Sequence, residues 1–501
     1  MRNAYQVADV RAAEQELMAG VPPGALMSRA AAGLAAASAT LLGQVYGARV
    51  AILAGSGDNG GDALFAGALL ARRGAAVTAI SAADRMHPGG SAALRAAGGR
   101  LAPAADQSAC DDLDRADLII DGLLGIGGRG GLREPAAGLA ARAARARSCG
   151  AQVVAVDLPS GVDADTGEVP GAAVRADVTV TFGTWKPGLL VDPGASLAGA
   201  AHLVDIGLGP HLTEPAVTAL QAADVAGLLP AAGPESDKYR RGVLGIVAGS
   251  SRYSGAAVLA SGGAIRGGAG MVRLVSAPQV LDVVRQHWPE AVLTPADPDA
   301  AGQTVQTAGR VQAWVAGPGM GTGDDAADLL AAVLHTSVPV LVDADGITLL
   351  AEHRELLDRR APTLITPHAG ELARLTGADR ADIEARRLHH VTAAAAELGV
   401  TVLLKGSTTL IASAVPGRQV LVNATGTPRL ATAGSGDVLS GLAGALIAQG
   451  VEIQHAAAAA AYLHGIAGRQ AADGAPIGAQ DIIGWLPAAF RGVAAAAQDQ
   501  A

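Results

Sequence analysis

The stretch "AILAGSGDNGGDALFAG", residues 51–67, decides the fold of the first half of this chain. It begins as an apolar strand, continues through a glycine-rich turn and ends as the start of a helix. Such a unit points free backbone N–H groups at one spot, where an anion such as a phosphate can bind. The turn, however, carries Asp58 and Asp62 and no Lys or Arg. The sequence therefore raises the question of what holds an anion beside two carboxylates.

Strand and helix patterns alternate through both halves of the 501 residues. Helical spacing over the first ~45 residues predicts two N-terminal helices. The apolar strands that follow predict a parallel sheet covered on both faces. The pattern lapses over residues 208–237, which we interpret as a linker or domain edge, and then restarts. The predicted fold class is α/β, with a Rossmann-like three-layer N-terminal domain and a second three-layer α/β domain of similar length.

Composition and charge exclude several classes of protein. The formal net charge is −9 without a dense run of Lys and Arg, which argues against electrostatic binding to nucleic acid or to an anionic membrane. Cys110 and Cys149 have no metal-type spacing, so a reducing compartment is the default. The N-terminus lacks the apolar core of a signal peptide, and residues 438–451, the least charged segment, are too few to span a bilayer. We expect a soluble cytoplasmic protein with small-molecule ligands and neither nucleic acid nor a membrane as partner.

Three predicted strand ends in the first half carry polar residues: 55–62, 121–135 and 157–167. Each alone reads equally well as a tight turn whose glycines supply positive φ and whose Asp residues cap helices. The string "GSGDNG" matches the dinucleotide fingerprint G-x-G-x-x-G, but the acidic residue expected after the next strand is not well placed. Together, at one edge of a sheet, the three ends favour a ligand site. Carboxylates and phosphates can share it when a cation lies between them, and Asn, Ser and Asp oxygens are hard-cation ligands.

The segments "GSGDNGGD", "DGLLGIGG", "DLPSGVDADTG" and "TFGTWKPG", in this order, resemble the NAD(P)HX epimerase domain, also called the YjeF N-terminal domain, over residues 1–213. The resemblance implies a potassium ion bound by Asn59, Asp121 and Ser160, and hydrated NADH or NADPH as the substrate. The family loop usually begins with Asn where this chain has Asp58. The substrate contacts that the resemblance implies are Asp58, Asn59, Gly60, Gly61, Asp62, Gly125, Ile126, Gly127, Gly128, Arg129, Gly130, Gly131 and Asp157.

Epimerisation at the ring carbon that bears the hydroxyl needs a proton acceptor and a proton donor near the nicotinamide. Asp157 directly follows an apolar strand. Burial in such a place raises the pKa of a carboxyl toward the working pH. Asp157 is therefore the predicted catalytic acid–base group of the first half.

The stretch "TAGSGDVLSGLAGALIAQG", residues 432–450, carries the strongest signal of the second half. Its glycines and Ser435 precede a long apolar helix, so free N–H groups meet the positive end of the helix dipole. Asp437 lies in the first turn, where an Asp often only stabilises its own helix, by ~0.3–1 kcal/mol. Beside an anion site, it also matches a base that takes a proton from a hydroxyl while a phosphoryl group is held close.

Two further residues of the second half each have a structural alternative. Lys405 ends a predicted strand before small hydroxyl residues, which suits nucleotide phosphates but also a solvated hairpin. His368 begins a predicted helix after a buried strand, and a lone His there is more often structural than functional.

The segments "DKYRRGVLGIVAGSSRYSGAAVLA", "AGPGMG", "TPHAGE", "KGSTT" and "AGSGD", in this order, resemble the ribokinase-like NAD(P)HX dehydratase domain, also called the YjeF C-terminal or CARKD domain, over residues 222–497. The resemblance implies a ribokinase-like fold, Mg²⁺ and ADP as cofactors, and Asp437 as the catalytic base. ADP would phosphorylate the hydroxyl of the S epimer, so that phosphate leaves and NAD(P)H is restored. The family usually opens with His-Lys-Gly, whereas Lys238 lies between Asp237 and Tyr239, and no role is assigned to that segment. The implied substrate contacts are Ala256, Gly319, His368 and Asp437, and the implied nucleotide contacts are Lys405, Gly406, Ser407, Thr408, Thr409 and Gly436.

The two halves together predict a bifunctional enzyme of metabolite repair, in which an epimerase supplies a dehydratase that accepts one epimer. Two alternatives stay open. A ribokinase-like small-molecule kinase with an appended non-catalytic nucleotide-binding domain would release a stable phosphorylated product. An N-terminal domain that serves only as a scaffold would need no cation ligands. A simple NAD dehydrogenase is disfavoured because its ribose-binding acid is missing, and we expect a homo-oligomer.

Overall fold

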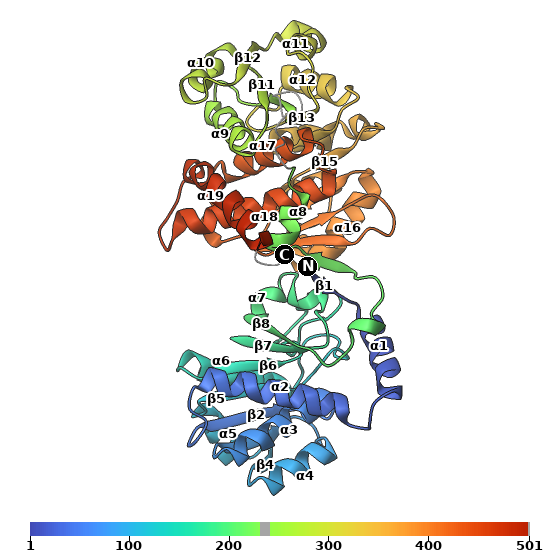
Figure 1. The fold of residues 1–501 in the computed structure, drawn as a ribbon, viewed down its shortest axis with the longest axis vertical. Helices are drawn as coiled ribbons and strands as arrows, with labels where there is room; N and C mark the ends of the chain where they lie inside the picture. Colours follow the sequence, from blue (N-terminus) through green and yellow to red (C-terminus); the bar gives the residue numbers. More distant parts are fainter. Residues whose placement is uncertain (231–240, 499–501) are drawn as a thin grey trace. The chain divides into compact units, whose positions relative to one another are not determined.

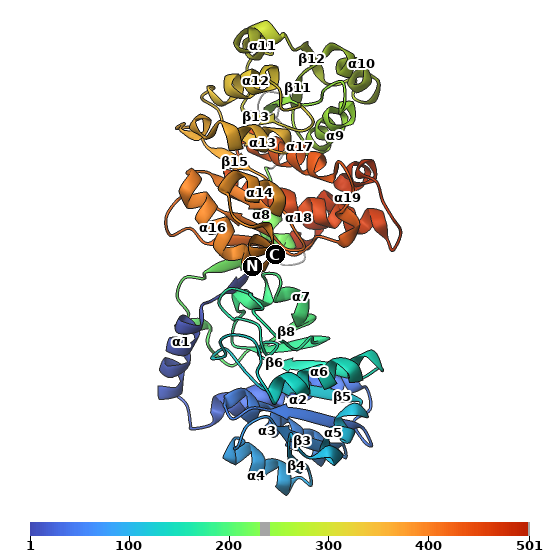
Figure 2. The same cartoon turned by 180° about the vertical axis from the view of Figure 1, so that it is seen from behind.

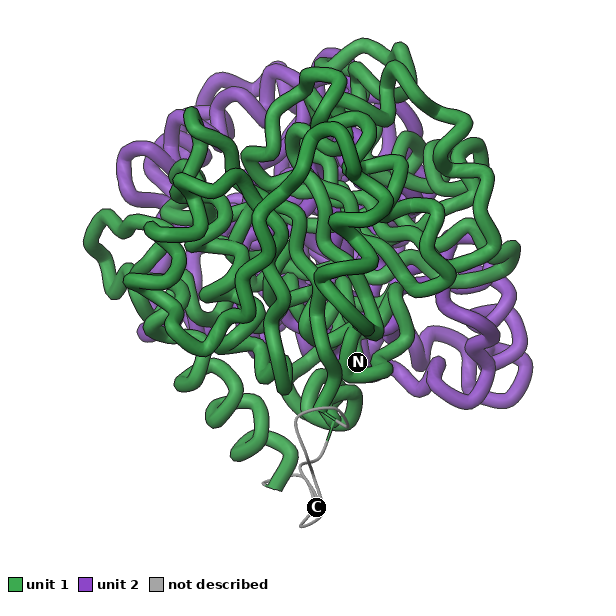
Figure 3. Tube along the Cα trace, turned by 90° about the horizontal axis from the view of Figure 1, so that it is seen from above, with its two compact units in different colours: residues 1–2, 218–501 green, residues 3–217 purple. Residues whose placement is uncertain are grey.

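Two separate sheets organise the chain, which the computed structural model describes over residues 1–230 and 241–498. The chain divides into an N-terminal unit, Asn3–Val217, and a C-terminal unit made of Met1–Arg2 and Thr218–Ala501 (purple and green in Figure 3). The units differ by a few residues from the expected ranges 1–213 and 222–497.

The segment 208–237, interpreted above as a linker, contains regular structure. Strand β9 (Val217–Ala219) belongs to the sheet of the C-terminal unit, and helix α8 (Ala222–Leu228) begins with a capping box. A linker is therefore wrong for these residues, whereas a domain edge agrees with the division of the chain between Val217 and Thr218. The motif that holds Asp237, Lys238 and Tyr239 lies outside the described residues.

The N-terminal unit is built on a seven-stranded sheet of order β4-β3-β2-β5-β6-β7-β8 (Figure 1). Every neighbouring pair is parallel, as the near-continuous apolar strands predict. All carboxyl ends therefore open on one edge. The strands are β2 (Arg49–Ala54), β3 (Ala76–Ser81), β4 (Arg100–Pro103), β5 (Leu118–Gly122), β6 (Gln152–Val156), β7 (Val178–Phe182) and β8 (Ala200–Val204).

Both faces of this sheet are buried, because alternate residues of one strand belong to different core clusters. Ile52 of β2 packs into the cluster formed with α2, α3 and α4, while Leu53 packs into the cluster formed with α5 and α6. This is the three-layer arrangement expected from the sequence. The helices are α1 (Val7–Ala19), α2 (Ala25–Leu42), α3 (Asp58–Arg72), α4 (Pro88–Ala96), α5 (Gln107–Asp114), α6 (Ala136–Ser148) and α7 (Ala195–Ala198).

Helix α2 is the one helix of the described residues that is long and apolar enough to cross a membrane by length and composition. In this structure it packs against α3 and the sheet through Leu34 and neighbouring alanines. The least charged segment of the sequence, 438–451, lies mostly in the shorter apolar helix Ser435–Ala448.

The C-terminal unit is built on an eleven-stranded sheet of order β1-β9-β18-β17-β16-β15-β14-β13-β10-β11-β12. Strands β10 to β16 pair in parallel, whereas β16, β17 and β18 form antiparallel pairs. The antiparallel turn puts the residues after β16 in a hairpin. The strands not yet given are β1 (Arg2–Ala4), β10 (Val243–Val247), β11 (Met271–Ser276), β12 (Val292–Pro295), β13 (Ala313–Ala316), β14 (Val340–Val342), β15 (Thr363–Ile365), β16 (Thr401–Leu404), β17 (Thr409–Ala412) and β18 (Val420–Asn423).

Small residues let the helices of this unit pack with their backbones in contact. A Cβ at Gly441 of α17 would lie 2.0 Å from the Ala260 carbonyl oxygen of α9, and one at Gly263 would lie 2.3 Å from the Val438 carbonyl oxygen. These two glycine contacts fix the position of α17 closely against α9. Helices α12, α13, α14 and α16 cover the other face of the sheet (Figure 2). The longer helices are α9 (Ser254–Arg266), α10 (Pro278–His287), α11 (Ala301–Thr307), α12 (Asp324–Leu334), α13 (Asp345–Glu352), α14 (Ala369–Thr376), α15 (Arg380–Ala385), α16 (Arg387–Leu398), α17 (Ser435–Ala448), α18 (Ile453–Ala472) and α19 (Ala479–Gln498).

Candidate active sites

The glycine loop between β2 and α3 is shaped by close backbone contacts. A Cβ at Gly55 would lie 2.0 Å from the Leu123 carbonyl oxygen, and one at Gly60 would lie 2.3 Å from the Gly55 carbonyl oxygen. Only glycine fits these two positions. The loop therefore lies directly against the segment that follows β5, as the strand-end argument predicts.

Two of the three predicted potassium ligands contact each other. Asp121 is fully buried, and its Oδ1 accepts a hydrogen bond from Ser160 Oγ at 2.7 Å, while its Oδ2 accepts one from the Ser160 N–H at 2.8 Å. Ser160 Oγ also accepts a hydrogen bond from the Leu124 N–H at 2.9 Å. Burial raises the pKa of Asp121 to about 6, although the hydrogen bonds from Ser160 and Leu123 oppose this rise.

The third ligand, Asn59, reaches the same place from α3. Its Nδ2 donates to the Val156 carbonyl at 2.7 Å and, more weakly, to the Leu124 carbonyl at 3.4 Å. A Cβ at Gly125 would lie 2.2 Å from Asn59 Oδ1, so glycine is required beside it. The structure thus brings Asn59, Asp121 and Ser160 together around the Leu124 backbone, with oxygen atoms as the available donors. One carboxylate among neutral oxygens fits a hard cation of low charge.

Asp157 is buried, 5% exposed, and it adopts a left-handed backbone with φ of 64°. Its Oδ1 accepts hydrogen bonds from Lys186 Nζ at 2.5 Å, from Thr181 Oγ1 at 2.9 Å and from the Phe182 N–H at 3.1 Å. The sequence analysis predicted the burial but not the ion pair. Asp157 is therefore a carboxylate with a dedicated counter-charge, not one governed by burial alone.

Lys186 is the main residue of this unit that sequence reasoning missed. It is 1% exposed, and its Nζ also donates to Thr181 Oγ1 at 3.1 Å and to the Phe182 carbonyl at 3.0 Å. These bonds offset the large cost of burying an ammonium group. Lys186 lies in the quoted segment "TFGTWKPG" at the end of β7. Because β7 pairs in parallel with β6, this segment lies beside Asp157, and this is the feature that could have indicated Lys186.

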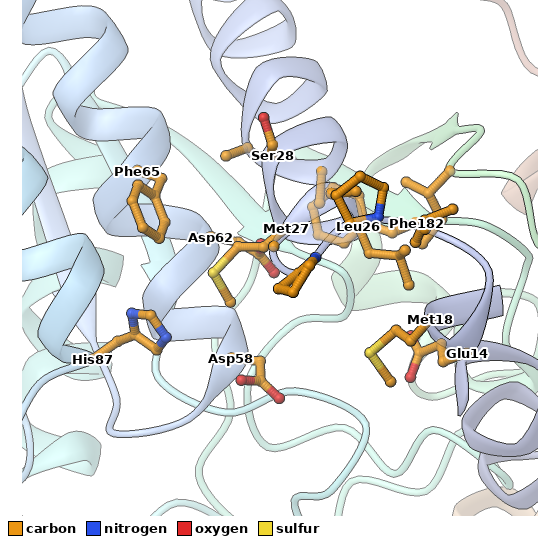
Figure 4. A pocket seen from close by; sticks show the side chains of 18 of the residues that line it. Glu14, Met18, Leu26, Met27, Ser28, Asp58, Asp62, Phe65, His87 and Phe182 are labelled. Atoms are coloured by element: carbon orange, nitrogen blue, oxygen red, sulfur yellow. The ribbon is translucent and has the colours of Figure 1, made fainter. Parts of the chain in front are cut away.

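A cavity of about 880 Å³ opens between α1, the start of α2, and α3. Figure 4 shows Asp58 and Asp62 on the α3 side and Glu14 on the α1 side, with Met18, Phe65 and other apolar side chains around them. Of the predicted substrate contacts, Asp58 and Asp62 line this cavity, whereas Asp157 and the loop 125–131 do not.

Two carboxyls that line this cavity have a raised pKa. Asp62 is 6% exposed and its buried Oδ1 accepts no hydrogen bond. Burial, followed by the charges of Asp157, Asp58 and Glu14, raises the pKa of Asp62 to about 8. Burial also raises the pKa of Glu14, a cavity residue that sequence reasoning missed, although Lys186 opposes this rise.

The loop 125–131 makes separate local contacts. The Gly128 N–H donates to the Gly125 carbonyl at 2.9 Å, and a Cβ at Gly127 would lie 2.8 Å from Nη2 of Arg11 in α1. The Arg11 guanidinium therefore lies beside this glycine loop. The loop also contains Arg129, whose side chain is exposed to solvent. Ile126 packs partly into the core, Gly130 has a φ of 76°, and Gly131 lies against Gly171.

In the C-terminal unit, α17 begins after Gly434, whose φ is 85°. Ser435 Oγ donates to the Leu430 carbonyl at 2.7 Å, which anchors the loop to the helix start. Asp437 lies in the first turn, as predicted. Burial and then the charge of Asp343 raise the pKa of Asp437 to about 7, although Lys405 opposes this rise.

Lys405 is part of a charged cluster beside Asp437. Its Nζ lies 2.8 Å from Asp343 Oδ1 and 3.6 Å from Glu371 Oε2. Asp343 is 1% exposed and accepts a hydrogen bond from Ser440 Oγ of α17 at 2.6 Å. Burial lowers the pKa of Lys405, but Asp343 and Glu371 outweigh it and the net pKa is raised. Sequence reasoning missed Asp343, which directly follows β14.

The other predicted nucleotide residues surround this cluster. Positions 405–408 form the hairpin between β16 and β17, and the guanidinium of buried Arg387 donates to the carbonyls of Leu404, Lys405 and Thr408. A Cβ at Gly406 would lie 2.3 Å from Arg387 Nη2, so the hairpin needs glycine there. Gly436 lies close to the cluster, because a Cβ on it would be 3.5 Å from Lys405 Nζ. Ser407 is exposed, Thr408 is buried, and Thr409 begins β17.

The predicted substrate contacts of this unit fall into two groups. His368 caps α14, because its Nδ1 accepts hydrogen bonds from the N–H groups of Gly370 and Glu371 at 3.0 and 3.2 Å. This is the structural role that the sequence analysis had weighed against a ligand contact, and burial lowers the pKa of the ring. Ala256 and Gly319 lie side by side, since a Cβ at Gly319 would be 2.7 Å from that of Ala256.

Comparison with known proteins finds matches for both units. A family model described as YjeF-related protein N-terminus matches residues 23–188, and one described as NAD(P)H-hydrate dehydratase matches residues 244–484. A protein of Mycobacterium tuberculosis (strain CDC 1551 / Oshkosh), named bifunctional NAD(P)H-hydrate repair enzyme Nnr, is 48% identical over 465 residues, which cover 91% of this chain and 92% of that protein. A protein of Mycobacterium leprae (strain TN) with the same name is 47% identical over 484 residues, which cover 95% of this chain and 96% of that protein.

Solved structures match the C-terminal unit. The ADP/ATP-dependent NAD(P)H-hydrate dehydratase of Bacillus subtilis, co-crystallised with ATP and Mg²⁺, is 28% identical with a TM-score of 0.50, and the match covers 55% of this chain and 97% of that one. A ribokinase-like superfamily protein of Enterococcus faecalis, 24% identical with a TM-score of 0.50 over 56% of this chain and 98% of that one, shares the fold. The predicted ribokinase-like fold is thereby confirmed. Because this chain covers more than nine-tenths of two relatives that are 48% and 47% identical to it, it belongs to the family of bifunctional NAD(P)H-hydrate repair enzymes.

Proposed function

We propose that this chain repairs hydrated NADH and NADPH in two steps, one in each unit. The N-terminal unit interconverts the R and S epimers of the hydrate, and the C-terminal unit dehydrates the S epimer to NAD(P)H at the expense of ADP. The observation that carries the proposal is that each unit has a carboxyl with a raised pKa beside a glycine-rich helix start, the buried Asp62 and the half-buried Asp437. A cytoplasmic location and a homo-oligomeric state belong to the same proposal.

In the N-terminal unit, Asn59, Asp121 and Ser160 would hold the potassium ion, whose charge offsets the repulsion between the carboxylates and the substrate phosphates. Residues 58–62 and 125–131 contact the substrate, and the free N–H groups at the start of α3 bind its phosphates. Asp157, held by Lys186, is the acid–base group that accepts a proton from the ring hydroxyl.

In the C-terminal unit, Asp437 takes the proton of the substrate hydroxyl while the terminal phosphoryl group of ADP passes to that oxygen and AMP is released. The N–H groups at the start of α17 stabilise the charge on the transferring group. Phosphate then leaves as the ring nitrogen donates its electron pair. Ala256, Gly319 and His368 contact this substrate, and residues 405–409 with Gly436 contact the nucleotide.

A magnesium ion, when bound, supplies charge neutralisation at the phosphates. Within residues 1–230 and 241–498, no three His, Cys, Asp or Glu side chains are arranged to hold a metal. This fits Mg²⁺, which usually binds through one or two carboxylates together with substrate phosphates rather than in a protein cage. Asp343 and Glu371 are the carboxylates available in the Lys405 cluster.

The proposal is tested by incubating mixed hydrate epimers with the protein, potassium, magnesium and either ADP or ATP, and following the absorbance of reduced nicotinamide. Full recovery is expected, with phosphate released. Recovery of reduced nicotinamide that stops when one epimer is consumed would exclude the epimerase role of the N-terminal unit. A stable phosphorylated product without reduced nicotinamide would favour a small-molecule kinase instead.

A further inference from the structure

The wall that α3 presents to the cavity of the N-terminal unit contains a carboxyl with one buried oxygen that has no hydrogen-bond partner. Asp62 is more than nine-tenths buried, and its Oδ1 accepts no hydrogen bond from the protein. An ionised carboxylate in such a place loses hydration free energy that no protein donor at Oδ1 replaces. The burial of Oδ1 therefore favours the protonated form of Asp62.

Asp157, the neighbouring carboxyl, has the opposite environment. Its Oδ1 accepts three hydrogen bonds, one of them from the buried ammonium of Lys186. A carboxylate with a paired cation and two further donors is stabilised as the anion. The two acids thus differ in their partners, since Asp157 accepts three hydrogen bonds and Oδ1 of Asp62 accepts none, and such a difference in environment can separate acid and base roles.

We propose that Asp62 is the proton donor of the epimerase site and that Asp157, held by Lys186, is the proton acceptor that works with it. This inference rests on the proposed epimerase function and assigns the half of the acid–base pair that the sequence left open. In the proposed step, Asp157 removes the proton of the ring hydroxyl, the carbon–nitrogen bond beside that hydroxyl breaks, and the ring nitrogen takes a proton from Asp62.

The product of this step is an open-chain aldehyde and an amine. Rotation about the adjacent carbon–carbon bond presents the other face of the aldehyde to the nitrogen. The nitrogen then adds to the carbonyl carbon and returns its proton to Asp62, while the oxygen takes a proton from Asp157. Atoms, electrons and protons balance over one cycle, and no oxidant or co-reactant is needed.

The remaining surroundings of Asp62 agree with this role. The charged groups that act on it are Asp157 after β6, Asp58 one turn earlier on α3, and Glu14 of α1 across the cavity. All three are acids, and all three disfavour a second negative charge. His87 also lines the cavity. Its Nδ1 caps α4 by accepting a hydrogen bond from the Gly90 N–H at 3.1 Å. Apart from Arg72, the rest of the cavity is lined largely by apolar side chains.

The test measures interconversion of the pure R epimer by the full-length protein without adenine nucleotide, with the two epimers quantified by chromatography between pH 6 and 9.5. For wild type, the rate constant at saturating substrate is expected to fall above about pH 8, where Asp62 loses its proton. Asp62→Asn is expected to lower this constant by ~10²–10⁴ with little change in KM and without the alkaline fall. Asp62→Glu, which keeps the acid, is expected to retain part of the rate and the alkaline fall.

Asp84→Asn is the matched control, because Asp84 is an exposed carboxylate of the same unit and does not line the cavity. It should behave as wild type. An Asp62→Asn variant within threefold of the wild-type rate would overturn the inference. So would a slow variant that keeps the alkaline fall, because the titrating acid would then be another group. If wild type itself fails to interconvert the epimers, the proposed epimerase function fails instead.

Discussion

Replacing Asp62 by Asn should stabilise the N-terminal unit while it removes activity. Asp62 has no hydrogen-bond donor to Oδ1 and three acids as neighbours. The native state therefore has to keep this carboxyl protonated, whereas the unfolded chain releases the proton freely. Asn has nearly the same shape and carries no charge at any pH, so the variant avoids this penalty.

The magnitude follows from the pKa of Asp62, which rises from its ordinary value of 3.8 to about 8. At 1.36 kcal/mol per pKa unit, this shift corresponds to about 6 kcal/mol as an upper limit, and to about 4 kcal/mol at pH 7. Between the two pKa values the native state binds more protons than the unfolded state. The stability of the wild type therefore falls with rising pH across this window because of Asp62, and the advantage of Asp62→Asn grows from pH 4 to pH 8.

Hydrogen exchange of the full-length protein, read by mass spectrometry on peptides from β2 and α3, measures this free energy within the N-terminal unit. The difference between Asp62→Asn and wild type should increase from about zero near pH 4 to several kcal/mol near pH 8. Asp84→Asn, which removes an exposed carboxylate of the same unit, should show no such trend. A difference that is constant with pH, or a variant less stable than wild type at pH 8, would refute the assignment of a protonated Asp62.

Further predictions concern both sites. Asp437→Asn should lower the dehydration rate by ~10²–10⁴ while calorimetry shows unchanged nucleotide binding, and near-normal turnover would remove Asp437 as the base. The base must be ionised, and the pKa of Asp437 is about 7. The rate of dehydration by the wild type should therefore rise with pH through 7 and then level off. A rate that does not change between pH 5.5 and 8.5 would contradict this. Lys186→Met leaves Asp157 as an unpaired buried charge, so thermal unfolding should show a loss of ~3–5 kcal/mol that Lys186→Met/Asp157→Asn largely restores. Replacing potassium by tetramethylammonium should slow epimerisation and leave dehydration of the pure S epimer unchanged, and equal slowing of both would argue against a cation in the N-terminal unit.

The parallel strands of both sheets could be predicted from the sequence, because fully buried strands leave unbroken apolar runs. Strand β9 could not, since its three residues are too few for any period to appear. In the sheet β9 lies between β1 and β18, both distant in sequence, and Thr218 Oγ1 donates to Gln419 Oε1 at 2.6 Å across 201 positions. The segment was therefore interpreted as a linker or domain edge; the chain does divide there, but β9 is part of the second sheet.

The convergence of Asn59, Asp121 and Ser160 could also be predicted, because the carboxyl ends of neighbouring parallel strands meet at one edge. Glu14 could not be predicted, because only Val10 and Ala13 of α1 are buried and the helix otherwise reads as solvated. Lys186 and Asp343 could not be predicted for another reason. Lys and Asp are seldom fully buried unless they are paired, and the partner of each is far away in the sequence, at 29 positions for Lys186 and 62 for Asp343.

The two units arrive at the same arrangement of charges from unrelated motifs. In each, a lysine pairs with the Asp that directly follows a parallel strand, Lys186 with Asp157 and Lys405 with Asp343. In each, a second carboxyl with a raised pKa lies in the first turns of the helix after a glycine-rich loop, Asp62 in α3 and Asp437 in α17. A strand end fixes an ion pair rigidly, and a helix start brings anion-binding N–H groups within reach of the second acid. Burial raises the pKa of the second acid in each unit, and the charge of the paired carboxylate, Asp157 or Asp343, raises it further. The carboxylate of each ion pair thus contributes to the pKa of the neighbouring acid, which apolar residues in place of the pair would not do.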